Sequence, residues 1–182
     1  MATGEHREFA GDGSGLSRNA VLALIAVTLT IHNGEEYFAF PLFFGSMGRR
    51  LSGWLPTPAL QHSVANLHIA LIAATLLPGI FIAWAIFSPR QWLLVAALLV
   101  EAVLLVNAFA HMLAAVLRDG YVPGLITAVL INLPFGWYVL RRAIRDRWIL
   151  IAVAWQLIAV AVALHVAWLS SIFWFARPVV SR

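Results

Sequence analysis

The chain has 182 residues, of which 62% are hydrophobic and 11% are charged, and it has no cysteine. A soluble domain is about 45–50% apolar and about 25% charged, so this composition indicates an integral membrane protein, and the lack of cysteine excludes disulfides and thiolate-held metal sites. The formal net charge of +4 comes from arginines between the apolar runs, which fits orientation signals and anionic lipid headgroups and argues against nucleic acid as a partner.

The chain divides into a short tail and one apolar domain. Residues 1–17 are rich in glycine and lack apolar periodicity, which predicts a flexible N-terminal tail. The rest, residues 18–182, is predicted to be a single domain of the all-α class, an integral membrane bundle of five transmembrane helices. Each of its apolar segments is long enough, or nearly so, to cross roughly 30 Å of hydrocarbon. These segments lie near residues 19–44, 62–87, 92–117, 123–140 and 148–174.

Prolines and arginines add detail to this topology. Pro41, Pro78 and Pro134 fall inside predicted helices and are expected to kink them. With five spans the termini lie on opposite sides, and seven arginines fall on the N-terminal side against five on the other. The stretch RRAIRDR at residues 141–147 is the densest of these clusters. The positive-inside rule therefore favours a cytoplasmic N-terminus of a multi-pass protein.

The first apolar segment contains the polar stretch IHNGEEY. At about 1.5 Å of rise per residue, His32 lies about 20 Å into the membrane from the N-terminal side. His32 and Glu36 are four residues apart and share a helix face, and Glu35 lies beside them. Gly34 has no side chain, so we expect another group to approach the helix closely there.

Histidines of other segments fall at the same depth. His111 and His165 lie about 26–29 Å from the N-terminal side, because their helices run in the same direction as the first. His68 lies on an antiparallel helix and also falls in the distal half of the bilayer. Four histidines from four helices are therefore predicted at one level, together with the two glutamates.

Burying these charges requires compensation. Each charge at mid-membrane costs roughly 2.5–3.5 kcal/mol, unless it is paired, protonated or bound to a cation. Imidazole and carboxylate together suit divalent zinc, iron or manganese. The sequence thus predicts one or two divalent metal ions, zinc or iron first, in the distal half. The predicted ligands are His32, Glu35, Glu36, His111 and His165.

Two further polar residues lie deeper in the bundle. Glu101 is about 15 Å from the level of His111 along the same helix, and Asn132 lies at mid-depth on the fourth segment, where it could meet Glu101. Buried polar residues of this kind also serve simply to hydrogen-bond neighbouring helices. We therefore treat Glu101 as a second-level catalytic candidate.

Three short motifs resemble the signatures of one family. HNGEE matches the motif after which the HxxEE membrane-protein family is named, and NAFAH and YVPG look like its NxxxH and YxPG signatures. The resemblance implies a small helical membrane protein, and no reaction is carried over. The matching positions are His32, Glu35, Glu36, Asn107, His111, Tyr121, Pro123 and Gly124.

The first functional hypothesis is a membrane metalloenzyme that acts on a lipid-soluble small molecule. Its ion would activate water for hydrolysis or, as iron, activate oxygen. In this hypothesis Glu35 is a ligand or general base, and His68 is a ligand or proton relay.

The alternative is a metal-free acid-base enzyme. His32 and Glu36, with Glu101 deeper, would protonate an isoprenoid double bond and remove a proton elsewhere, giving an isomerase or cyclase. This arrangement resembles that of five-span sterol isomerases. A site around Glu101 favours this alternative, whereas a shallower site without Glu101 favours the metal. A third hypothesis, an ion or proton pathway, is disfavoured by the nearly all-apolar cytoplasmic half.

Overall fold

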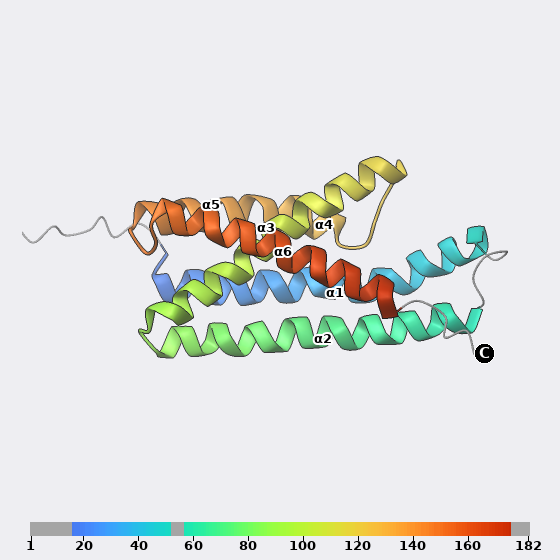
Figure 1. The fold of residues 1–182 in the computed structure, drawn as a ribbon, viewed down its shortest axis with the longest axis horizontal. Helices are drawn as coiled ribbons and strands as arrows, with labels where there is room; N and C mark the ends of the chain where they lie inside the picture. The colour runs from blue at the N-terminus through green and yellow to red at the C-terminus, as the bar shows by residue number, and fades with distance from the viewer. Residues whose placement is uncertain (1–15, 52–56, 176–182) are drawn as a thin grey trace, which may run out of the picture.

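Every regular element of the described chain is helical, which confirms the all-α class. The computed structural model describes residues 16–51 and 57–175, so most of the predicted tail at 1–17 lies outside the described residues. Figure 1 shows an elongated bundle. Its elements are α1 (Arg18–Leu51), α2 (Thr57–Phe87), α3 (Gln91–Arg118), α4 (Leu125–Thr127), the π-helix η1 (Ala128–Asn132), α5 (Leu133–Arg145) and α6 (Ile151–Phe175).

These elements form five continuous rods, because α4, η1 and α5 follow one another without a break. The π-helix ends directly before α5, whose first turn contains Pro134. Proline offers no N–H to the preceding turn, and a locally wider turn accommodates this loss. Pro41 and Pro78 lie inside α1 and α2, and both helices continue past them.

Three helices have the length and apolar composition of membrane spans. Within the described residues these are Val64–Phe87, Gln91–Arg118 and Ile151–Ser170, which makes the chain a multi-pass membrane protein. The first and fourth predicted spans do not reach that standard. The polar HNGEEY stretch interrupts the apolar sequence of α1, and the π-helix divides the fourth rod. Five spans therefore remain a prediction.

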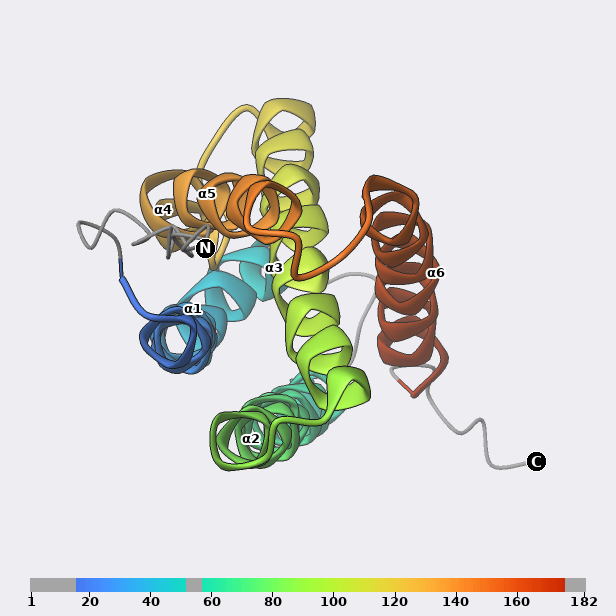
Figure 2. The ribbon, with the colours of Figure 1, turned by 90° about the vertical axis from the view of Figure 1, so that its left-hand side faces the viewer.

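Helix α3 is the centre of the bundle. It packs against α1, α2, η1, α5 and α6, and Figure 2 shows it crossing between the other helices. Its alanines Ala97, Ala102 and Ala108 are fully buried, and small side chains of this kind let membrane helices approach closely. Large apolar side chains such as Phe38 and Ile80 are instead exposed, as expected where a helix contacts lipid.

One end of the bundle joins the start of α1 to the arginine-rich end of α5. Arg142 bonds to Asp146, to the Tyr138 hydroxyl and to the carbonyl oxygen of Leu16. The guanidinium groups of Arg145 and Arg142 hold the pKa of Asp146 below its usual range. The N-terminus of α1 and the RRAIRDR stretch therefore lie on one side, as the sequence predicts.

Candidate metal centre

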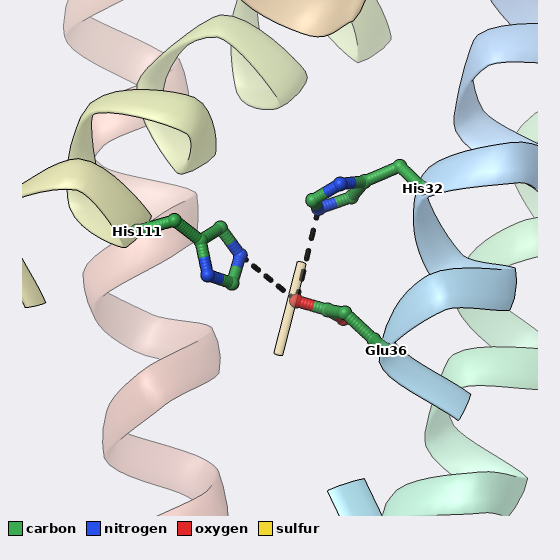
Figure 3. Close-up of side chains that lie close together, drawn as sticks. All are labelled: His32, Glu36 and His111. Carbon is green, nitrogen blue, oxygen red and sulfur yellow. Dashed lines mark ion pairs between the residues drawn. The ribbon is translucent and has the colours of Figure 1, made fainter. Parts of the chain in front are cut away.

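Two helices bring together three side chains that can bind a metal ion. His32 and Glu36 lie one turn apart on α1, and His111 lies on α3. One possible ligand atom from each lies within 4.8 Å of the other two. Glu36 Oε1 is 2.9 Å from His111 Nε2 and 3.7 Å from His32 Nε2, so the carboxylate stands between the two imidazoles (Figure 3). The His32 side chain is fully buried, and those of Glu36 and His111 are 11% and 13% exposed.

Hydrogen bonds fix the orientation of the His32 ring. Its Nδ1 lies 2.7 Å from the hydroxyl oxygen of Thr127, and that hydroxyl donates at 2.7 Å to Oε2 of Glu35. A hydroxyl has a single hydrogen to donate, so Nδ1 of His32 carries the proton of the first contact. The lone pair of Nε2 then points into the cluster, where it accepts a hydrogen bond from Asn107 Nδ2 at 2.6 Å.

The His111 nitrogen is buried without a hydrogen bond. Its Nε2 touches Glu36, yet it makes no hydrogen bond of acceptable geometry among the described residues. Gly124 closes this side of the cluster, because a Cβ there would lie 2.7 Å from His111 Cε1 and 3.0 Å from Glu36 Oε1. The φ of Gly124 is also +86°, a conformation that favours glycine.

Glu35 faces the turn that follows α3 rather than the cluster. Its Oε1 accepts from the Tyr121 hydroxyl at 2.8 Å and from the N–H of Ile126 at 3.2 Å, and its Oε2 accepts from the N–H of Thr127 at 2.7 Å. These N–H groups belong to the first turn of α4, which otherwise has no side-chain cap. Burial and the bond to Glu35 raise the pKa of Tyr121 to about 12.

The structure places the remaining predicted histidines differently. His165 of α6 is buried, and its Nε2 has no hydrogen-bond partner in the described part of the chain. It lines the same cavity as Glu36 and His111. His68 instead bonds from Nε2 to the carbonyl oxygen of Tyr37 at 2.9 Å and stacks on the Tyr37 ring. His165 thus lies near the three-residue cluster, and His68 is engaged with the backbone of α1.

Glu101 and Asn132 are both fully buried, and neither lines the cavity beside the cluster. The side-chain oxygens of Glu101 and the amide of Asn132 have no hydrogen-bond partner over the described residues, so no bond joins the two. Glu101 faces α5, because a Cβ at Gly136 would lie 2.9 Å from its Oε1. The expected close approach at Gly34 is wrong, since nothing lies within 4 Å of a Cβ built there.

A cavity of about 550 Å³ opens beside the cluster. Its walls come from α1, α2, α3 and α6, and most of them are aliphatic. Polar side chains gather at one part of the wall, and Glu101 does not contribute to the lining. The polar lining residues are Asn33, Glu36, Asn107, His111 and His165.

Sequence reasoning missed Thr127, which supports both His32 and Glu35. Its signal was a lone hydroxyl in an apolar run three residues after the YVPG motif. The geometry also explains why three motifs occur together in one chain. Asn107 contacts His32, and Tyr121 contacts Glu35. The motifs therefore meet at one place in the fold.

The ligand set has a defined chemistry. Two imidazole nitrogens and one carboxylate oxygen are the protein ligands of many catalytic zinc sites and of non-haem iron centres, both of which leave positions open for other ligands. Fold and site together define a multi-pass helical membrane protein with a buried His-Glu cluster that can hold a metal ion. The family of proteins of unknown function with the HXXEE motif matches residues 23–139, and the chain belongs to this family, as its motifs predict. No curated protein and no solved structure matches the chain.

Proposed function

We propose that the protein is a membrane-embedded, metal-dependent enzyme that acts on a lipid-soluble substrate. One observation carries the proposal: His32, Glu36 and His111 present three ligand atoms within 4.8 Å of one another in a largely buried site. A buried carboxylate between two imidazoles is costly unless a proton or cation is shared among them. A divalent ion satisfies all three groups at once.

The surroundings of the cluster support metal ligation. Ligating histidines usually donate their other ring N–H to an outer group that fixes the tautomer, and the His32–Thr127–Glu35 chain supplies such a group. Among the described residues Nε2 of His111 has no hydrogen bond to give up, only its 2.9 Å contact with Glu36. The amide of Asn107 would turn away from His32 Nε2 when an ion binds. Glu35 is then a positioning residue, and the turn that it holds covers the site.

The chain's own residues suggest how a reaction would proceed. A zinc or iron ion held by these residues supplies Lewis acidity and an activated water or, as iron, oxygen chemistry. His165 lines the cavity beside the ligands with its Nε2 unpartnered, so it can move a proton to or from a substrate or serve as a further ligand. The aliphatic walls exclude water and favour an apolar substrate.

The metal-free isomerase fits the geometry less well. That hypothesis needs an acid at mid-depth facing the substrate, and Glu101 faces α5 instead of the cavity. The site lies one level away, around His111. A shallower site without Glu101 is the arrangement that favours the metal hypothesis, so we prefer that hypothesis.

The test is elemental analysis of the detergent-purified protein beside three variants. We expect about one equivalent of zinc, iron or manganese in the parent, and its loss in His32→Ala and Glu36→Ala. His68→Ala is the matched control, because this histidine bonds to the backbone of Tyr37 and should leave the metal content unchanged. A parent without metal after purification and after reloading with each ion would overturn the proposal.

A further inference from the structure

The cavity beside the cluster is elongated along α3. Along α3 its lining runs from Ala96 to Ala114, which corresponds to about 27 Å at about 1.5 Å per residue. A volume of about 550 Å³ is spread over this length. An elongated cavity with aliphatic walls suits an extended hydrocarbon chain.

The cavity lies between helices that do not pack tightly on each other. Helix α2 packs on α1 and α3, and α6 packs chiefly on α3. Figure 2 shows α2 and α6 standing apart on two sides of α3. Both helices contribute to the cavity wall, Leu71 from α2 and Leu164 from α6. The cavity wall is therefore shared by two helices that pack on α3 more than on each other.

The two ends of the cavity differ in polarity. Near Ala96 and Pro78 the walls are aliphatic, whereas the other end contains Glu36, His111 and His165. No arginine is among the lining residues of the described chain, and the chain has no lysine. Among the described lining residues a phosphate or carboxylate headgroup would find no side-chain cation, and its positive partner would be limited to an ion held by the cluster. A neutral oxygen group instead finds Nε2 of His165, which has no hydrogen-bond partner among the described residues.

We propose that the cavity binds one neutral single-chain lipid, with its head, an alcohol, aldehyde or ester, at the His-Glu cluster and its hydrocarbon chain along α3 toward Ala96. This inference rests on the proposed function and names its class of substrate. The unpartnered Nε2 of His165 hydrogen-bonds the head oxygen. The hydrocarbon chain of the bound lipid lies against aliphatic side chains of α2 and α3. It makes the contacts with these side chains that bilayer lipid would otherwise make.

The test is photocrosslinking of the full chain in phosphatidylcholine nanodiscs. Two hexadecanol probes carry a diazirine, one next to the hydroxyl and one near the end of the chain. We expect the first to label peptides around His111 and His165, and the second to label α3 near Ala96 and α2 near Pro78. A phosphatidylcholine probe with a diazirine in one chain should label exposed side chains such as Ile80 and spare the cavity.

Cavity-filling variants separate specific from general labelling. Val103→Trp fills the cavity from α3, and Ala74→Phe fills it from α2 if the first variant folds poorly. Either should lower hexadecanol labelling at least 10-fold and leave the metal content unchanged. Leu113→Trp is the matched control, because this side chain is exposed on α3 and does not line the cavity.

Each outcome identifies which proposal fails. Labelling that is reversed in order, unaffected by both cavity-filling variants, or reproduced by the phosphatidylcholine probe would overturn the single-chain lipid site, whatever the metal content. Ordered, variant-sensitive labelling of a protein that binds no metal would support the lipid site and overturn the metal proposal. Ordered labelling with bound metal supports both.

Discussion

Nδ1 of His32 lies 2.7 Å from the hydroxyl oxygen of Thr127, a residue 95 positions later in the chain. The same hydroxyl donates to Glu35 at 2.7 Å. Two residues of the HxxEE motif are thus joined through one hydroxyl of the turn that follows α3. One of them faces the cluster and the other holds the turn, so the motif couples the candidate ligands to the segment that covers them.

Thr127→Val should weaken metal binding without removing any ligand. Valine has nearly the same shape but accepts no hydrogen bond from His32, so the ring is free to change tautomer and orientation. Loss of an outer-shell partner typically costs 10–100-fold in metal affinity, and we expect a loss in that range. Titration of zinc against a chromophoric chelator measures it. Thr127→Ser keeps the hydroxyl and should bind zinc with an affinity within a few-fold of the parent. Equal zinc affinities for Thr127→Val and the parent would show that the contact between Thr127 and His32 plays no part in metal binding.

The two adjacent glutamates should respond oppositely to the same substitution. Glu36→Gln removes the charged ligand between two imidazoles and should abolish stoichiometric metal. Glu35→Gln should keep the metal within the error of elemental analysis but destabilise the fold, because an amide cannot accept hydrogen bonds with both of its ends. Hydrogen bonds to charged groups contribute about 1.5–3 kcal/mol, so a loss of about 2 kcal/mol in the free energy of unfolding is expected. Metal loss in Glu35→Gln with normal stability would contradict these assignments.

The sequence predicted the helices and the level of the site because both follow from one-dimensional rules. Apolar length marks helices, and rise per residue gives depth, so these rules place His32, Glu36 and His111 at one level. The direction in which each side chain points does not follow from depth. Glu35 and His68 lie near the predicted level, yet hydrogen bonds to the turn and to the backbone of Tyr37 direct them elsewhere.

The π-helix and the role of Thr127 were beyond the same rules. Both depend on how the fourth rod sits against α1 and α3, which is a matter of long-range packing. The motif YVPG predicted a turn, but only the fold shows that the turn covers the cluster through Gly124.

Gly124→Ala should destabilise the site, whereas Gly34→Ala should not. An alanine Cβ at position 124 would meet His111 Cε1 at 2.7 Å, and its φ of +86° is strained for any side chain. We expect a loss of about 1–3 kcal/mol and a lower metal content. Position 34 lies in α1 with open space around it, so alanine there should leave the thermal midpoint equal or higher. Equal thermal midpoints for both variants would show that the turn at Gly124 does not pack against the cluster.

Tyr121→Phe should cost stability by an amount that does not change between pH 6 and pH 9. The phenol donates to Glu35, and its pKa in the folded protein is raised to about 12, above the ordinary value of 10.0. A raised pKa means that the stabilisation is fully present below about pH 10 and is lost as the pH rises through about 12. Thermal unfolding in detergent at several pH values measures the difference between parent and variant. If the difference already shrinks as the pH rises from 6 to 9, the phenol is not held in its protonated form.

Glu101→Met should stabilise the protein without affecting the metal. The carboxyl of Glu101 is fully buried between α3 and α5 and has no hydrogen-bond partner among the described residues. Burying a polar group without a hydrogen bond costs about 1–3 kcal/mol in proteins, and methionine removes this cost with an unbranched side chain of similar length. We expect a gain of that order in the free energy of unfolding and an unchanged metal content. Leu105→Met, at the same interface, controls for introducing a methionine and should be neutral or slightly destabilising. Destabilisation by Glu101→Met, together with loss of a lipid-converting activity that the metal variants retain, would instead restore Glu101 as the acid of a metal-free enzyme.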